Sequence, residues 1–112
     1  MHAARFYRTL TGNEVVLDWI RKLGKDDQRV IGRDILRVQF GFPMGLPLCR
    51  SLGGGLWEIR STLTNRTEAR LIFYFDAPLQ SVVVLHAFIK KSQKTPKAEI
   101  ELALHRKRES EA

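Results

Sequence analysis

The stretch Ser81–Ile100, SVVVLHAFIKKSQKTPKAEI, changes from the pattern of a buried strand to that of a helix start. Its first ten residues are rich in β-branched and aromatic side chains, which favours a strand over Ser81–Lys90. Thr95 is a typical helix N-cap and Pro96 a typical first helical residue, so a terminal helix is expected to follow. Four lysines surround this junction, with no acid before Glu99: Lys90, Lys91, Lys94 and Lys97. They form either a solvated linker or a site for a polyanion.

Two further strands are predicted upstream of this stretch. Leu56–Thr62 and Glu68–Phe75 are also rich in β-branched and aromatic residues. Turn-forming residues separate the three segments, which favours an antiparallel meander. The loop GFPMGLPL and the run Gly53–Gly55 precede it and break the chain.

The N-terminal half has helical spacing. Apolar residues between Val15 and Leu23, and again between Val30 and Val38, recur on one face, and the second helix is expected to run to about Phe40. A weak alternation at Arg5–Thr9 indicates a short strand. The predicted fold is therefore a single α+β domain over residues 1–112, with the order β-αα-βββ-α and helices packed on one face of an antiparallel sheet.

Composition limits the function further. The 112 residues carry a formal charge of +7, which favours phosphate-bearing or acidic partners over a neutral metabolite. One cysteine, Cys49, cannot form an internal disulfide, and the three histidines show no ligand spacing, so neither a metal nor a cofactor is expected. The chain has no segment typical of a signal peptide or a membrane span, so we expect a cytoplasmic protein without a membrane partner.

Strand alternation predicts which polar side chains share a face. The face opposite the apolar core collects six of them from the three strands: Glu58, Arg60, Arg70, Tyr74, His86 and Lys90. A half-exposed sheet commonly has such a polar outer face, so this set also fits a merely solvated surface. His86 alone among apolar residues is more typical of a structural histidine, and Glu58 can simply pair with a neighbouring arginine.

Several motifs in combination resemble the RelE/HigB superfamily of type II toxin–antitoxin toxins, in particular its phage-derived HigB-like subgroup. They are FYRT, GLPLCRSLGGGLWEIR, ARLIFYF and FIKKSQKTP, and the resemblance covers nearly the whole chain. It implies a ribosome-dependent mRNA endoribonuclease that inhibits translation, with the ribosome and mRNA as partners. It also implies a cognate antitoxin, of the helix-turn-helix DNA-binding kind.

The resemblance, carried over by position, places basic site residues at Arg60, Arg70, Lys90, Lys91 and Lys94. Glu58 stands where the best-known toxin of the superfamily has a catalytic lysine, and that toxin's functional tyrosine has no counterpart in the terminal segment.

Metal-free RNA cleavage needs a base for the 2′-hydroxyl, cations for the phosphorane and an acid for the leaving oxygen. Arginine forks bind phosphate, so Arg60 and Arg70 are expected to stabilise the transition state. A lysine among cations exchanges its proton more easily than an isolated one, so Lys90, Lys91 or Lys94 can be the acid or base. Glu58 and His86 are alternative bases.

RNA binding is expected of Lys94, Lys97 and Tyr74, the tyrosine by stacking on a base. Two other functions remain open. One is a gyrase-inhibiting ParE-like toxin with the same fold, and the other is a non-catalytic RNA- or protein-binding module.

Overall fold

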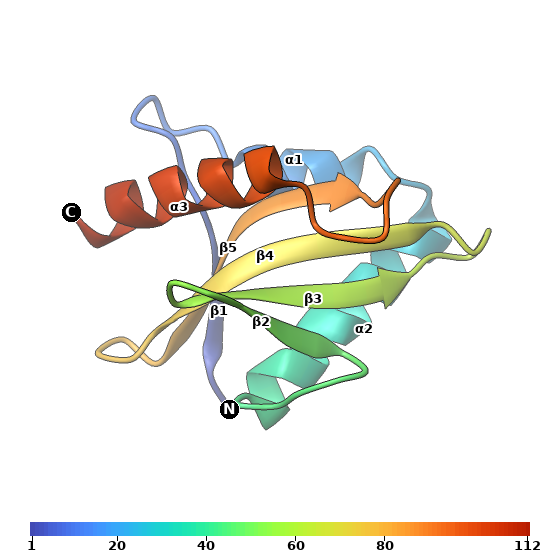
Figure 1. Ribbon diagram of the computed structural model, residues 1–112, viewed down its shortest axis with the longest axis horizontal. Helices are drawn as coiled ribbons and strands as arrows, with labels where there is room; N and C mark the ends of the chain where they lie inside the picture. The colour runs from blue at the N-terminus through green and yellow to red at the C-terminus, as the bar shows by residue number, and fades with distance from the viewer.

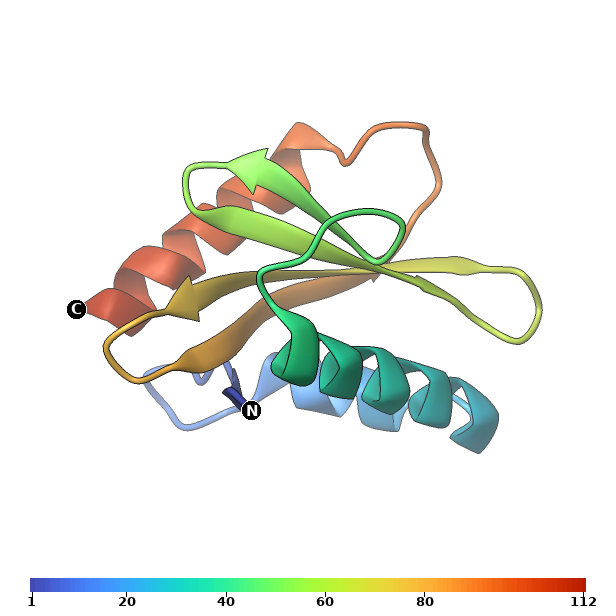
Figure 2. The ribbon, with the colours of Figure 1, turned by 90° about the horizontal axis from the view of Figure 1, so that it is seen from below.

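A five-stranded sheet with helices on both faces forms the protein, as Figures 1 and 2 show. The computed structural model describes residues 1–112. In chain order the elements are β1 (Ala3–Phe6), α1 (Val15–Arg21), α2 (Lys25–Gly41), β2 (Cys49–Gly53), β3 (Leu56–Thr62), β4 (Glu68–Asp76), β5 (Ser81–Ile89) and α3 (Lys97–Glu111). No helix combines the length and apolar character needed to cross a membrane.

The sheet has the strand order β1-β5-β4-β3-β2. The α+β class and the antiparallel meander of β3, β4 and β5 are confirmed. The sheet is mixed rather than wholly antiparallel, because β1 pairs with β5 in parallel. β1 also begins two residues earlier than the alternation indicated, at Ala3.

The strand β2 is an addition to the predicted order. It is five residues long, has several exposed positions and pairs with the start of β3. The turn between them has φ values of +83°, +62° and +81° at Gly53, Gly54 and Gly55. Only glycine adopts such angles readily, which explains the triple glycine.

The helices α1 and α2 cover one face of the sheet and enclose the main core. Their apolar stripes pack on the inward side chains of the strands, among them Ile31, Val38, Ile59 and Phe73. This is the packing that the helical spacing predicted.

The helix α3 lies on the opposite face, so the expectation that all helices share one face is wrong. Figure 2 shows α3 on one side of the sheet and α1 with α2 on the other. Ala103 is fully buried there against Leu56, Ile72 and Tyr74. Ile100, Ala103 and Leu104 recur at helical spacing and form the apolar stripe of α3, but helical spacing does not indicate which face of a sheet receives the stripe.

A bulge in β5 changes one more assignment. The register between β4 and β5 shifts between Ile72 and Phe73. Alternation counted back from His86 predicts Val83 and Leu85 in the main core, but Leu85 is the extra residue of the bulge, and both side chains lie under α3 instead.

Candidate functional site

The charged part of the sheet lies on the α3 face, beyond the end of the helix. The strand register pairs Arg60 with Arg70 and Glu58 with Ile72, so these three charged residues share one face as predicted. The segment between β5 and α3 passes over this part of the sheet (Figure 1). The site is therefore covered on one side by the lysine-rich segment.

Glu58 and Arg70 are buried, each only 2% exposed, which corrects the expectation of an outward-facing pair. The Nε atom of Arg70 lies 4.0 Å from Oε1 of Glu58. The Nη1 atom of Arg70 donates to the carbonyl oxygen of Ala69 at 3.0 Å. The Nη1 atom of Arg70 also lies 3.7 Å from Oε1 of Glu68, so this buried arginine has a carboxylate partner on each of two strands.

Thr95 completes this buried group. Its hydroxyl donates to Oε2 of Glu58 at 2.6 Å, across 37 residues of sequence. It is therefore not the cap of α3: Pro96 occupies the N-cap position and no side chain caps the helix. The hydrogen bond instead fastens the lysine-rich segment to β3.

Arg60 is the accessible cation of this group. Its side chain is half-buried and has no ion pair or hydrogen bond within the protein. Burial lowers the pKa of Arg70, and the charge of Arg60 lowers that pKa further, against the opposing effect of Glu58 and Glu68. Arg60 and Arg70 are paired in register across adjacent strands. Arg60 is the guanidinium of the two that an anion can reach.

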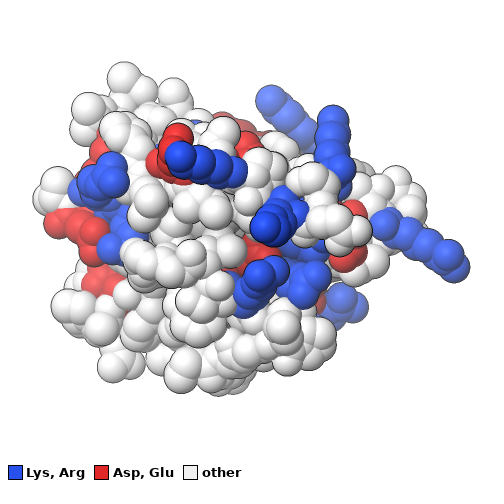
Figure 3. All heavy atoms as spheres, viewed as in Figure 1, with Lys and Arg blue, Asp and Glu red and all other residues white.

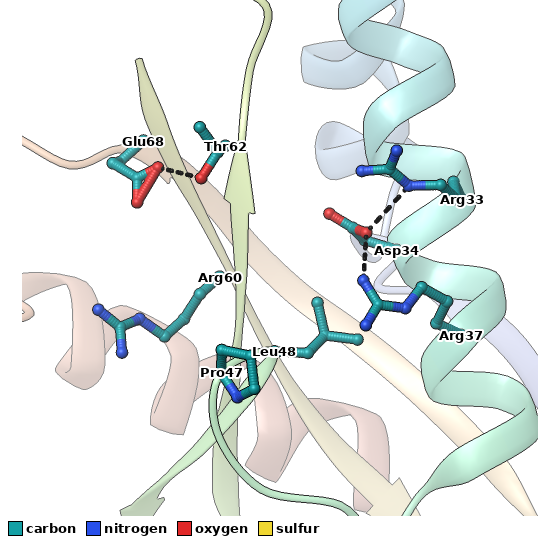
Figure 4. A pocket seen from close by; sticks show the side chains of 8 residues that line it. All are labelled: Arg33, Asp34, Arg37, Pro47, Leu48, Arg60, Thr62 and Glu68. Carbon is teal, nitrogen blue, oxygen red and sulfur yellow. Dashed lines mark hydrogen bonds and ion pairs between the residues drawn. The ribbon is translucent and has the colours of Figure 1, made fainter. Parts of the chain in front are cut away.

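Two polar pockets meet at Glu68, as their lining residues show. The first has a volume of about 340 Å³ and is drawn in Figure 4; its lining residues are Arg33, Asp34, Arg37, Pro47, Leu48, Arg60, Thr62 and Glu68. The second, of about 520 Å³, is lined by Arg66, Thr67, Glu68, Lys90, Lys91, Ser92 and Gln93.

Glu68 is an accessible carboxylate between these pockets. Its side chain is 37% exposed, and the hydroxyl of Thr62 donates to its Oε2. The N–H of Lys90 donates to its carbonyl oxygen at 2.8 Å, which brings the lysine-rich segment alongside. Glu68 was missing from the predicted site residues. Its position two residues before Arg70, on the same face of β4, was the signal for it.

The four lysines divide into two groups. Lys90 and Lys91 both line the second pocket, although consecutive strand residues point to opposite faces, because β5 ends at Ile89. Lys94 and Lys97 are exposed and line neither pocket, and Lys97 Nζ lies 3.7 Å from Glu101 Oε1. Lysine and arginine side chains gather beside the start of α3 on the face shown in Figure 3.

Tyr74 does not fit its predicted role in stacking on an RNA base. It is 3% exposed because α3 covers it, and Lys107 Nζ lies 5.3 Å from the centre of its ring. A base cannot reach this ring while α3 is in place.

His86 has the surroundings of a structural histidine. Its Nε2 lies 3.1 Å from Glu99 Oε2, and its ring stacks on Phe88. Burial lowers its pKa, although Glu99 opposes that effect. His86 lines neither pocket that contains Glu68, so the geometry does not support it as the base.

The geometry supports neither Cys49 as a nucleophile nor a metal site. Cys49 is buried, and burial raises its thiol pKa to about 11. No three His, Cys, Asp or Glu side chains are grouped to hold a metal ion.

Residues 18–108 match the family model described as Phage derived protein Gp49-like. The chain belongs to this family of RelE/HigB-type toxins. The resemblance to the RelE/HigB superfamily is thereby confirmed. No curated protein sequence matches the chain.

Solved structures of E. coli RelE have the same fold as this Gp49-like protein. The isolated RelE toxin superimposes with a TM-score of 0.62 at 14% identity, covering 94% of this chain and 98% of RelE. A RelE mutant in the free state gives 0.64 at 17% identity, with 94% and 96% covered. The intact RelBE toxin–antitoxin complex gives 0.61 at 17% identity, with 82% of this chain and 100% of the matched chain covered.

Proposed function

We propose that this Gp49-like protein is the toxin of a type II toxin–antitoxin system and acts as a ribosome-dependent mRNA endoribonuclease. Its family and its RelE fold support this function. The observation that carries the catalytic part is the position of Glu68, an accessible carboxylate between two pockets. Arg60 lines one of them, and Lys90 and Lys91 line the other.

This arrangement supplies the groups that metal-free RNA cleavage needs. The 2′-oxygen attacks the adjacent phosphorus and forms a new P–O bond while the bond to the 5′-oxygen breaks. Glu68 accepts the proton of the 2′-hydroxyl, and Lys90 or Lys91 donates a proton to the departing 5′-oxygen. Arg60 binds the non-bridging oxygens, whose charge increases in the phosphorane. The products are a 2′,3′-cyclic phosphate and a 5′-hydroxyl.

Arg70 and Glu58 act in this mechanism without touching the RNA. Their side chains are too buried to contact a substrate while the segment before α3 is in place. Arg70 instead adds positive potential behind Arg60, and Glu58 fixes that segment through Thr95. Both are positioning residues, and Glu68 replaces Glu58 and His86 as the proposed base.

The ribosome and an antitoxin are the proposed macromolecular partners. A small open site of this kind cannot by itself impose the in-line geometry on a flexible message, so the ribosome is expected to hold the message in the reactive geometry. The RelBE complex among the similar structures supports an antitoxin partner. The helix-turn-helix nature of that antitoxin stays a prediction from the resemblance, as do the cytoplasmic location and the RNA contacts of Lys94 and Lys97.

The reaction is tested by mapping new mRNA 5′ ends after the protein is induced in growing cells. We expect ends that carry a 5′-hydroxyl and recur at one position of the reading frame. A loss of DNA synthesis before any mRNA cleavage would instead indicate a gyrase inhibitor. Binding of ribosomes or RNA without cleavage would indicate a non-catalytic module.

The role of Glu68 is tested with purified ribosomes and message. Glu68→Gln should lower the cleavage rate by about 10² to 10⁴-fold, the usual contribution of a general base. The matched control is Glu101→Gln, which removes an exposed glutamate from α3 and should cleave like the parent. Ribosome binding should be similar in all three proteins. An unchanged cleavage rate in Glu68→Gln would exclude it as the base.

A further inference from the structure

The first pocket extends past the proposed reaction centre to a pair of arginines on α2. Figure 4 shows Arg33 and Arg37 on one side of β3 and Arg60 on the other. β2 pairs only with β3 residues up to Ile59, and the N–H of Arg60 donates to the carbonyl oxygen of Leu48. Beyond Arg60 no strand covers the edge of β3, so the pocket continues around this edge from one face of the sheet to the other.

Asp34 fixes the two arginines in place. It is buried, and its Oδ2 accepts a hydrogen bond from the hydroxyl of Ser61 at 2.8 Å. Its Oδ1 lies 3.4 Å from Nε of Arg33 and 3.4 Å from Nη1 of Arg37. One carboxylate oxygen thus orients two guanidinium groups, and their other N–H groups have no partner within the protein.

We propose that Arg33 and Arg37 form a second phosphate site, which binds the RNA backbone beside the nucleotide held at Arg60. This inference rests on the proposed function, because it takes the strand at Arg60 to be RNA. The strand then follows a path around the edge of β3, with cations on both faces of the sheet. Arg33 and Arg37 hold the message in register and take no part in bond breaking.

The chemistry of the pocket favours a phosphate over the side chains of a protein partner. Its only apolar lining is the buried Leu48 and the ring of Pro47, and no aromatic side chain lines it. Protein interfaces depend on apolar or aromatic anchors at their centre, which this pocket does not offer. Three guanidinium forks face the space against two carboxylates, one of them the buried Asp34. Planar forks of this kind match the oxygens of a phosphodiester.

The test measures binding of a twelve-nucleotide single-stranded RNA whose 2′-positions are methylated to prevent cleavage. Fluorescence anisotropy at several salt concentrations gives the dependence of affinity on salt. The variant is Arg33→Gln with Arg37→Gln. The matched control is the double substitution Arg21→Gln and Arg29→Gln, which removes two exposed arginines that are also each paired with an aspartate on their own helix.

We expect the slope of log affinity against log salt to become shallower by about 0.7 in the variant, since the two arginines bind one phosphate and each phosphate contact on a single strand contributes about 0.7. The control should match the parent. If the variant melts below the control, Arg33→Gln alone keeps the pair of Arg37 and Asp34, and its slope should still be shallower than that of the control, by no more than about 0.7. An equal slope in variant and control overturns the proposal.

Two further measurements separate this inference from the proposed function. Cleavage by the parent protein on ribosomes tests the proposed function alone. If the parent binds RNA through Arg33 and Arg37 but never cleaves it, the phosphate site is supported and the proposed nuclease function is contradicted. Binding of poly-glutamate tests the competing occupant. A variant that binds RNA like the control but loses poly-glutamate would show that the arginines bind an acidic protein, which also overturns the proposal.

Discussion

The two faces of the sheet are built on different principles. The face under α1 and α2 is an apolar core of fifteen buried residues, and ordinary strand and helix periodicity accounts for it. The face under α3 has an apolar part of seven buried residues beneath the helix. Its other part, beneath the segment before α3, contains the buried charges Glu58 and Arg70.

This difference shows that a charged residue in the interior can support a site without belonging to its accessible surface. The apolar face is held by contacts that tolerate small changes in geometry. The charged part depends on a few polar contacts, among them Thr95 with Glu58 and Glu58 with Arg70. Replacing the buried Arg70 should therefore lower stability much more than replacing the half-buried Arg60 with which it is paired across adjacent strands.

The largest effect is expected for Arg70→Ala. It deletes a fully buried side chain and leaves Glu58 charged and without its cation, so the free energy of unfolding should fall by about 3 to 5 kcal/mol. Urea denaturation measures it. The matched control is Arg60→Ala in the adjacent strand, which should change stability by less than about 0.5 kcal/mol because Arg60 has no partner to lose.

A second substitution separates lost packing from the orphaned charge. If the charge dominates, Arg70→Ala combined with Glu58→Gln should be more stable than Arg70→Ala alone, since no unpaired carboxylate remains buried. Equal stability of these two proteins would assign the loss to packing. An Arg70→Ala protein as stable as Arg60→Ala would contradict the burial of the pair.

The strands of the meander could be predicted from sequence nearly to the residue because alternation and β-branched side chains act locally. The same local rules could not find β2. Its five residues have little apolar content, and their strand conformation depends on pairing with β3. The bulge in β5 likewise depends on its neighbouring strand, so the faces of Val83 and Leu85 were assigned wrongly.

The features of the candidate site that could be predicted from sequence are likewise those with local causes. Alternation correctly placed Glu58, Arg60 and Arg70 on one face. Their burial was not predictable, because arginine and glutamate are ordinary residues of an exposed face and the segment that covers them lies some thirty residues later. Alternation also places Glu68 on this face, whereas Arg33 and Arg37 of α2 reach the site only around the edge of β3, which no local pattern describes.

A smaller effect is expected for Thr95→Val, which keeps the shape of the side chain and removes its hydroxyl. The variant leaves Glu58 without its hydrogen bond, so stability should fall by about 1.5 to 3 kcal/mol, the usual contribution of a hydrogen bond to a charged group. Urea denaturation measures the change, and hydrogen exchange should show faster exchange of amides in the segment before α3.

The control for Thr95→Val is Thr67→Val, because the Thr67 hydroxyl makes no hydrogen bond in the structure. Its stability should stay close to that of the parent. If Thr95→Val unfolds like this control, the segment is held by other contacts and Glu58 does not anchor it. Cleavage should also decrease in Thr95→Val, since Lys90 and Lys91 lie on the released segment.

The smallest effect is expected from pH, through His86. Burial lowers the folded-state pKa of His86 below its ordinary value near 6.5, despite the opposing carboxylate of Glu99. The unfolded chain therefore takes up the proton first as pH falls through about 6.5, and the folded state loses stability by at most about 1.4 kcal/mol for each pH unit. The loss ends once pH passes below the folded-state pKa. His86→Gln should remove this dependence. The free energy of unfolding in urea is therefore measured for both proteins between about pH 7 and pH 5. The difference between the two proteins reports His86 alone, because the contributions of the other titrating groups cancel. If the parent instead gains stability over His86→Gln on acidification, the ion pair with Glu99 outweighs burial. The start of α3 and the segment before it would then be held by two polar contacts, His86 with Glu99 and Thr95 with Glu58.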